Sequence, residues 1–289
     1  MAGGASEPAV NPEGQRRFGI LHHPKLPHSQ DLALEIAQFL EERGQQSWTG
    51  SSWAPEGFVE QLGSTDLIIT LGGDGTILRT ARVCAAAAVP ILAVNLGRLG
   101  YLAELQPANW RQGLEEVLKQ AYWLEERMML VAEHHRGDEL LHGSLSLNEA
   151  VVGRGRLARV IRITANVDGA EVARYVADGL IAATPTGSTA YAFAAGGPIM
   201  PPTIRNILLV PIAPMFGLAR PVVLSQGALV RLTVETDHEA ILTVDGQLEV
   251  PLQSGDQVTV RAADYVASFV RLRPPSYFYQ SLSTRLRCV

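Results

Sequence analysis

The feature of this sequence that most constrains its fold is an unbroken apolar run that ends in a glycine turn. Residues 66–71 read DLIITL, and residues 72–76 read GGDGT. A short apolar run without polar alternation is typical of a strand buried on both faces of a parallel sheet. We therefore predict a strand over residues 66–71, a helix over 77–88 and the next strand over 89–95.

The residues before this run predict the same alternation. Residues 17–24 form a first strand, and Ser29 is a plausible N-cap for a helix through Arg43 that stops at Gly44. Strand and helix then alternate over residues 17–125, which predicts a parallel, three-layer α/β domain.

The pattern changes after about residue 127. Short alternating runs separated by Gly and Asp turns predict a β-rich second domain with hairpins, with strands over residues 160–167, 229–235, 241–244 and 257–261. A length of 289 residues also favours two domains. We expect a loose tail over 1–16, an α/β domain over 17–126, a β-rich domain over 127–273 and a C-terminal segment over 274–289 that packs back on another element.

Charge and composition exclude several classes of protein. A formal net charge of −5 lacks the basic excess that a dedicated nucleic-acid binder needs. The longest apolar stretch, residues 84–94, is short and broken by Pro90, so we expect no membrane span. With two cysteines, Cys84 and Cys288, a disulfide framework is not indicated and a cytoplasmic protein is expected.

The scarcity of lysine limits how the chain can hold a nucleotide. Lys25 and Lys119 are the only lysines, and no GxxxxGK[ST] sequence occurs. A P-loop is therefore excluded. Phosphates must be held by main-chain N–H groups, by arginines or by a metal ion.

The glycine turn at residues 72–76 predicts an anion site. Glycines let the chain turn tightly and let a ligand approach the backbone, and N–H groups at a helix start favour an anion. Ligands of open α/β sheets bind at the carboxyl ends of strands. A carboxylate there is unfavourable unless it acts, so Asp74 is expected to accept a proton from an attacking hydroxyl or to hold a metal. Alternatively, Asp74 is a turn residue or an N-cap supported by Thr76.

Two further segments carry candidate ligand contacts. Asn148 and Glu149 interrupt a strand-like run, where Asn suits an adenine edge and Glu suits ribose hydroxyls. The alternative is an edge strand with exposed polar residues. Residues 184–191 (TPTGSTAY) predict a second, hydroxyl-rich helix start, with Tyr191 available for stacking on a base. The alternative is a plain N-cap at Ser188 or Thr189 with Tyr191 in the core.

Some motifs are rejected as sites. Residues 153–158 (GRGRLA) fit a dinucleotide fingerprint, but the fingerprint must open a helix and the following run alternates like a strand. Asp168-Gly169 and Asp245-Gly246 favour hairpin turns. The spacing of His134, His135 and His142 does not favour a metal site.

Taken together, the motifs resemble the ATP-dependent NAD kinase family of the GGDGT kinase superfamily, over residues 17–287. GGDGT alone is shared with diacylglycerol, sphingosine and phosphofructokinase-type kinases, whereas the block at 178–191 is much more specific. The matching segments are GGDGT at 72–76, NLGRLGYL at 95–102, NE at 148–149, DGLIAATPTGSTAY at 178–191, GGPI at 196–199, ARP at 219–221, DGQ at 245–247 and FY at 278–279.

The resemblance implies a Rossmann-like α/β domain followed by a β-sandwich-like all-β domain, with NAD held between them and often across a subunit interface. It implies transfer of the terminal phosphate of ATP to the 2′-hydroxyl of the adenosine ribose of NAD, with Mg²⁺ or another divalent cation. It also implies small-molecule nucleotides as partners and a homodimer or homotetramer.

The same resemblance assigns roles to residues. Asp74 looks like the proton acceptor, and Asn148 and Glu149 resemble the adenine-side and ribose-side contacts. Arg79 and Arg159 stand where the family often places a basic or histidine contact. The full set of positions expected to bind nucleotide is Gly72, Gly73, Asp74, Gly75, Thr76, Arg79, Asn148, Glu149, Arg159, Asp178, Thr189, Ala190, Tyr191, Ala194 and Gln247.

The chain departs from the family pattern at three places. Ala194 stands where members often carry a Ser that contacts the ligand, residues 214–218 (PMFGL) replace a more usual PHSLS, and Val176 replaces a frequent basic residue. These departures leave the preference between NAD and NADH open.

Two other functions fit part of the pattern. A lipid or sphingoid kinase shares GGDGT, but the polar loop at 184–191 argues against an apolar acceptor groove. A non-catalytic NAD(P)-binding regulator would explain the departures, but the retention of Asp74, Asn148 and Glu149 disfavours it.

Overall fold

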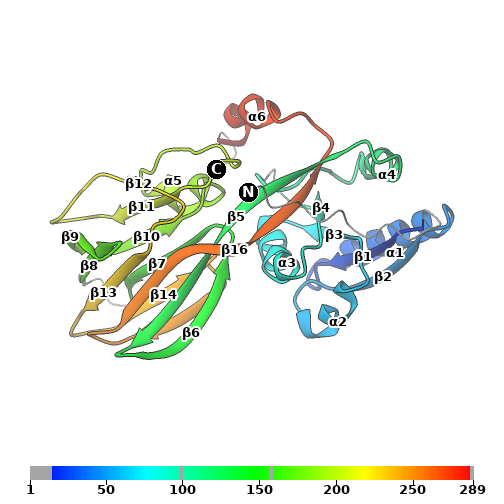
Figure 1. Cartoon of the computed structure of the whole chain (residues 1–289). Helices are drawn as coiled ribbons and strands as arrows, with labels where there is room; N and C mark the ends of the chain where they lie inside the picture. Colours follow the sequence, from blue (N-terminus) through cyan, green and yellow to red (C-terminus); the bar gives the residue numbers. More distant parts are fainter. Residues whose placement is uncertain (1–14, 98–99, 156–158, 287–289) are drawn as a thin grey trace, which may run out of the picture. The chain divides into compact units, whose positions relative to one another are not determined.

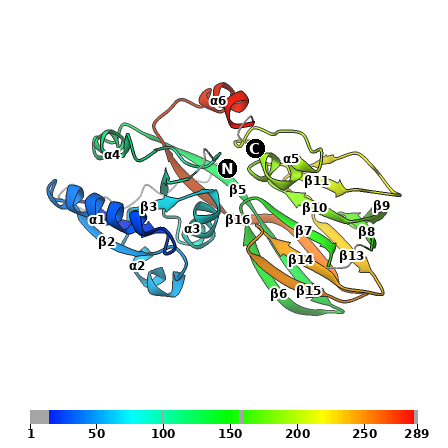
Figure 2. The same ribbon diagram turned by 180° about the vertical axis from the view of Figure 1, so that it is seen from behind.

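The computed structural model describes residues 15–97, 100–155 and 159–286, and Figures 1 and 2 show its two faces. The chain divides into two compact units. The first runs up to Glu125 and resumes at Ser268, and the second comprises Glu126–Ala267. The second unit thus ends before the expected boundary at residue 273, because the last part of strand β16 (Gln257–Arg271) pairs Phe269 with Ile91 of the first unit.

The first unit holds a parallel sheet in the spatial order β2-β1-β3-β4, with the end of β16 beside β4. Its strands are β1 (Arg17–His22), β2 (Gln46–Ser51), β3 (Leu67–Gly72), β4 (Ile91–Asn95) and the start of β5 (Trp123–Arg136). Its helices are α1 (Pro27–Glu41), η1 (Pro55–Gly57), α2 (Val59–Leu62), α3 (Asp74–Ala86), α4 (Trp110–Leu118) and α6 (Tyr277–Leu286).

Helices cover both faces of this sheet. On one face Phe39 of α1 and Trp110 of α4 share a buried cluster with alternate residues of β1, β3 and β4. On the other face α3 packs on β3, where the hydroxyls of Thr70 and Thr80 lie 3.1 Å apart and share a hydrogen bond. Because successive side chains of a strand point to opposite faces, β3 is buried on both. The predicted three-layer α/β arrangement and the buried strand are therefore confirmed.

Helix starts were predicted too late. α1 begins at Pro27, which is preorganised for a first helical turn, and not at a Ser29 cap. The Ser29 hydroxyl instead lies 2.8 Å from the carbonyl oxygens of both His23 and Leu26 and donates its one hydrogen there. α3 begins at Asp74, three residues before the predicted start. α1 ends at Glu41, two residues before the predicted end at Arg43, and Gly44 beyond it has the expected left-handed conformation with φ +72°, a value that favours glycine.

The second unit holds two antiparallel sheets. One has the order β12-β11-β10-β7-β14-β15, and the other runs from β6 through β5, β16, β13 and β8 to β9. The elements that follow β5 are β6 (Glu139–Ser146), β7 (Glu149–Arg154), β8 (Ile161–Val167), β9 (Ala170–Ala177), β10 (Gly179–Ala183), η2 (Gly187–Thr189), α5 (Tyr191–Ala194), β11 (Ile207–Ile212), β12 (Val222–Leu224), β13 (Val230–Glu235), β14 (Ala240–Val244), β15 (Leu248–Leu252) and the first part of β16.

Both sheets contribute to one core, in which Val152 and Leu242 of the first sheet pack with Ile163 and Leu232 of the second. Alternating burial along β8, β13 and β14 supplies the inward-facing residues. The β-sandwich-like all-β prediction is therefore confirmed. The predicted hairpin turns at Asp168-Gly169 and Asp245-Gly246 are also confirmed, because both pairs have positive φ between paired antiparallel strands.

Candidate functional site

The glycine turn of the first unit joins β3 directly to α3, at the carboxyl end of a central strand. A Cβ on Gly72 would overlap the buried Thr76 side chain, so close packing requires glycine there. Gly73 has an extended backbone, φ −89° and ψ −178°, and not the left-handed conformation that only glycine adopts freely. A Cβ on Gly73 would meet no atom within 4 Å, so the space before it is open to a ligand.

The Asp74 side chain is fixed by the backbone of a second loop. Its Oδ2 accepts the N–H of Tyr101 at 3.0 Å, and its Oδ1 accepts the N–H of Leu102 at 3.4 Å. A Cβ on Gly100 would overlap this carboxylate, so the loop can approach only because residue 100 is glycine. Asp74 is the first residue of α3, and the N-cap is Gly73. The alternative that Asp74 is itself the N-cap is therefore wrong. Each carboxylate oxygen has a further lone pair for a ligand hydroxyl.

In the second unit, Asp245 holds the segment that carries the candidates Asn148 and Glu149. Its Oδ1 accepts the Ser146 hydroxyl at 2.6 Å and the N–H groups of Asn148 and Glu149 at 2.8 and 3.2 Å. Its Oδ2 accepts the N–H of Leu147 at 3.0 Å. Four donors thus converge on one buried carboxylate, which fixes the backbone between β6 and β7.

Glu149 begins a strand in the interior of a sheet, and its side chain is buried. β7 pairs with β10 on one side and β14 on the other, so the edge-strand alternative is wrong. Glu149 is 7% exposed, and its buried Oε2 has no hydrogen-bond partner among the described residues. Burial, and secondly the negative charge of Asp245, raise the pKa of Glu149 to about 8. A buried, unsatisfied acceptor is costly and rare, and it is expected where a ligand supplies the missing donor.

The hydroxyls of Thr184, Ser188 and Thr189 each donate to a main-chain carbonyl of the second unit. The buried Thr184 hydroxyl donates to the Leu147 carbonyl at 2.6 Å, and the buried Ser188 hydroxyl donates to the Pro185 carbonyl at 2.6 Å. The Thr189 hydroxyl donates to the Thr186 carbonyl at 3.1 Å. These groups close a tight turn ahead of α5, which has four residues. A count of hydroxyls does not give their direction, and the expected nucleotide contact at Thr189 stays a prediction.

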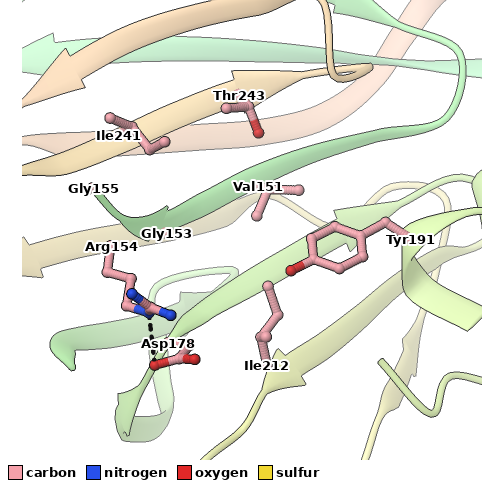
Figure 3. Close-up of a pocket in the computed structure, with 9 residues that line it drawn as sticks. All are labelled: Val151, Gly153, Arg154, Gly155, Asp178, Tyr191, Ile212, Ile241 and Thr243. Carbon is pink, nitrogen blue, oxygen red and sulfur yellow. Dashed lines mark ion pairs between the residues drawn. The ribbon is translucent and has the colours of Figure 1, made fainter. Parts of the chain in front are cut away.

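A pocket of about 310 Å³ lies in the second unit, and two predicted residues line it. Figure 3 shows the Tyr191 ring near Val151 and Ile212, and the Asp178 carboxylate joined to Arg154. The Arg154–Asp178 ion pair is 3.0 Å long, and Tyr191 is 46% exposed, so its assignment to the core is wrong. The other lining residues are Gly153, Gly155, Ile241 and Thr243.

The remaining predicted residues have varied surroundings. Arg79 lies in α3, and its guanidinium carbon is 5.0 Å from the centroid of the Trp53 ring. Arg159 is exposed, and its carbonyl lies 3.1 Å from His238 Nε2. Ala190 precedes α5, Ala194 ends it with an exposed side chain, and Gln247 donates its N–H to the Val244 carbonyl at 3.0 Å.

Sequence reasoning missed two residues that organise the candidate site. Asp245 carries a local hairpin signal, and nothing in the sequence indicates that its side chain reaches residues almost a hundred positions away. Arg154 was set aside as part of a rejected motif, although it lines the pocket and pairs with Asp178. The rejection itself is consistent with the structure, because β7 ends at Arg154 and β8 begins at Ile161, while residues 156–158 lie outside the described residues.

The described residues offer neither a ready-made group of metal ligands nor a membrane-crossing helix. None of their His, Cys, Asp and Glu side chains gather in a group of three or more that could hold a metal ion. No helix in these ranges is long and apolar enough to cross a membrane.

Comparisons with known proteins match both units. The family model of the ATP-NAD kinase N-terminal domain matches residues 41–122, and that of the ATP-NAD kinase C-terminal domain matches residues 147–272. The NAD kinase of Dehalococcoides mccartyi is 41% identical over 273 residues, which cover 94% of this chain and 96% of that protein. The NAD kinase of Chloroflexus aurantiacus is 40% identical over 271 residues, with coverage of 94% and 98%.

Solved structures agree with these matches. Yeast NADH kinase complexed with NADH aligns with a TM-score of 0.78 and 26% identity, covering 94% of this chain and 88% of that chain. An NAD kinase from Archaeoglobus fulgidus in complex with ATP aligns with a TM-score of 0.75 and 29% identity, covering 94% and 99%. The family expected from the motifs is therefore confirmed: this chain belongs to the NAD kinase family of phosphotransferases.

Proposed function

We propose that this chain transfers the terminal phosphate of ATP to the 2′-hydroxyl of the adenosine ribose of NAD, giving NADP and ADP. The observation that carries the proposal is the Asp74 carboxylate, which two main-chain N–H groups hold at the first turn of α3. It stands directly after a glycine turn at a strand end, where phosphates bind. The NAD and ATP of the proposal are those in the name of the family, and two solved relatives are complexes with NADH and with ATP.

Asp74 acts on the acceptor hydroxyl. It accepts a hydrogen bond from the 2′-hydroxyl and takes its proton as the oxygen attacks the terminal phosphorus of ATP. A new O–P bond forms, the bond between that phosphorus and the bridging oxygen of ADP breaks, and ADP leaves with the electron pair. Phosphoryl transfer depends on positioning and charge neutralisation, so an ordinary carboxylate is a sufficient base.

Residues of the second unit bind NAD in this proposal. Asn148 contacts the adenine, and the unpaired Oε2 of Glu149 accepts a ribose hydroxyl, which removes the cost of its burial. Tyr191 and Asp178 contact NAD in the pocket that they line, where an exposed ring offers a stacking surface and the carboxylate offers an acceptor.

We propose that the reaction uses a divalent cation, Mg²⁺, which the phosphates of the substrate hold together with a protein carboxylate. Mg²⁺ usually takes one or two carboxylates together with phosphates and waters, so no cluster of protein ligands is required. Asp74 is the protein carboxylate at the glycine turn that suits this role. When bound, the ion neutralises charge on the phosphates.

The test is conversion of NAD to NADP by the purified full chain with ATP and Mg²⁺, followed with an NADP-specific dehydrogenase. Asp74→Asn should fold normally and lose most of the turnover. Asp66→Asn is the matched control, because Asp66 also accepts a main-chain N–H, from Arg17 at 2.7 Å, but lies exposed at the other end of β3. Wild-type turnover in Asp74→Asn would remove Asp74 from the mechanism.

The same assay separates the alternatives. Phosphorylation of diacylglycerol or a sphingoid base, with none of NAD, would favour a lipid kinase. Thermal stabilisation by NAD without turnover by any phosphoryl donor would favour a non-catalytic regulator. Parallel reactions with NAD and NADH would show the acceptor preference that the departure at Ala194 leaves open.

We also propose that the chain is a cytoplasmic homodimer or homotetramer. Residues 214–218, which depart from the family pattern, support self-association through exposed apolar side chains, because Met215 is 66% and Phe216 69% exposed. Light scattering coupled to size exclusion would measure the subunit number. A buried, unpaired Cys84 agrees with a reducing compartment.

A further inference from the structure

A cluster of cationic and aromatic side chains comes from α3 and from the loops that follow β1 and β2, two strands that lie side by side in Figure 1. The Lys25 ammonium is 4.5 Å from the centroid of the Trp53 ring, and the Arg79 guanidinium is 5.0 Å from it. The His23 ring meets the same indole edge-on, with centroids 5.2 Å apart. These residues come from the loops after two strands and from α3, and Trp53 is 39% exposed.

The cluster shares a sheet edge with the glycine turn. β1 pairs in parallel with β2 on one side and β3 on the other, so the carboxyl ends of all three strands lie side by side. His23 follows β1, Trp53 follows β2, and Gly73-Asp74 follows β3. Ligands of parallel α/β sheets bind at this edge.

Lys25 and Arg79 lack a carboxylate partner among the described residues, whereas other cationic side chains that lie over aromatic rings have one. In the described part of the chain, four other arginines lie over an aromatic ring, and each also meets a glutamate. These are Arg43 with Glu115 at 2.6 Å, Arg111 with Glu35 at 3.0 Å, Arg271 with Glu125 at 2.7 Å and Arg273 with Glu104 at 3.8 Å.

Neither Lys25 nor Arg79 makes an ion pair with another described residue, and neither side chain has a hydrogen bond there. Both charges nevertheless lie against one ring, where they repel each other. An anion that binds both would turn this repulsion into attraction. The Trp53 ring holds the two cations at one place through cation–π contact.

We propose that Lys25 and Arg79, positioned by Trp53 and flanked by His23, bind the triphosphate chain of the phosphoryl donor. This inference rests on the proposed function for the identity of the donor. The recognised chemistry is a polyphosphate chain, which either a nucleoside triphosphate or inorganic polyphosphate presents. The cluster supplies side-chain cations where the first turn of α3 supplies main-chain N–H groups.

The test is calorimetric titration of the full chain with ATP in the absence of NAD, so that binding is measured without turnover. Lys25→Gln and Arg79→Gln should each weaken ATP binding about tenfold, the size of one lost charge-assisted contact. Trp53→Ala should weaken it as well. Lys119→Gln and Arg111→Gln are matched controls, since Lys119 and Arg111 pair with Glu116 and Glu35 on the surface, and both should bind ATP as the wild type does.

Inorganic tripolyphosphate forms the second arm. If the variant Lys25→Gln/Arg79→Gln binds ATP and tripolyphosphate more weakly than the wild type by the same factor, the result supports recognition of the phosphate chain. Unchanged ATP binding in that variant overturns the proposal, and so does a wild-type protein that binds ATP but not tripolyphosphate. The KM for NAD should change less than twofold in Lys25→Gln. If the wild type makes no NADP but loses ATP binding on these substitutions, the proposed function fails and this subsite stands.

Discussion

Replacing the buried acid Glu149 with Gln should stabilise the protein at neutral pH. The pKa of Glu149 is raised from 4.5 to about 8, first by burial and then by Asp245. Between these two values the folded chain keeps a proton that the unfolded chain has lost, so stability falls as the pH rises. The loss of stability that Glu149 causes is absent below about pH 4.5, grows between about pH 4.5 and pH 8, and is constant above about pH 8.

The structure gives the size of this effect. Each pKa unit corresponds to 1.36 kcal/mol, so about 2.5 units of the window are crossed by pH 7 and the penalty there is about 3 kcal/mol. Glu149→Gln removes the titrating group. The difference in unfolding free energy between variant and wild type should therefore grow by about 3 kcal/mol from pH 4.5 to pH 7 and level off near pH 8.

Urea denaturation at a series of pH values measures this difference. A comparison across pH cancels the constant cost of placing an amide in the site, and other titrating groups are common to both proteins. Glu171→Gln is the control, because Glu171 is an exposed acid of the same unit whose pKa is lowered by its hydrogen bond to Arg174. A difference between Glu149→Gln and wild type that stays flat from pH 5 to pH 8 would refute the reasoning.

Glu149→Gln should also raise the KM for NAD by about tenfold above pH 8, where Glu149 is ionised in the folded chain, because the amide offers a hydroxyl a weaker acceptor than a carboxylate. Higher stability with weaker substrate binding is the behaviour of a group held in a strained state for function. A variant that gained stability and kept the wild-type KM would leave Glu149 buried but outside the NAD site.

Two more substitutions test the groups that hold the candidate site. Asp245→Asn must set an amide N–H₂ against a main-chain N–H or give up other donors, so urea denaturation should show a loss of about 2–4 kcal/mol in unfolding free energy. Removal of the Asp245 charge should also lower the pKa of Glu149, so the pH range over which Glu149 affects stability should end at a lower pH. Gly100→Ala places a Cβ on the Asp74 carboxylate, so kcat should fall at least about tenfold, the scale of a misplaced catalytic group. ATP binding measured by calorimetry should stay within about twofold of the wild type. An unchanged kcat would show that the loop at 100–102 does not position Asp74.

The arrangement of the first unit could be predicted because it follows from local patterns. The run DLIITL is too apolar for any place except a strand covered on both faces, and glycines after it announce the turn into α3. The starts of α1 and α3 were each missed by three residues, since Pro27 and Asp74 suit a first helical turn as well as a loop. Such boundaries depend on which backbone N–H groups find partners.

The direction of polar side chains in the second unit could not be predicted. The sequence counts four hydroxyls in residues 184–189 without giving their direction: that of Thr184 reaches the carbonyl of Leu147, 37 positions away, and that of Ser188 turns back to the carbonyl of Pro185. Asp245 was expected to serve its own hairpin, and its carboxylate instead binds residues 146–149. Sequence patterns of period two give the face of a strand, and they do not identify long-range hydrogen-bond partners.

The same contacts explain why Glu149 has an unsatisfied oxygen. A carboxylate at the start of a strand can often turn to nearby main-chain N–H groups, but Asp245 has taken those of Leu147, Asn148 and Glu149 itself. Asp245 therefore fixes the position of Glu149, removes its local donors and adds a negative charge that favours its protonated form. A group deprived of protein donors in this way gains most from a ligand that brings its own, and a ribose with two hydroxyls is such a ligand.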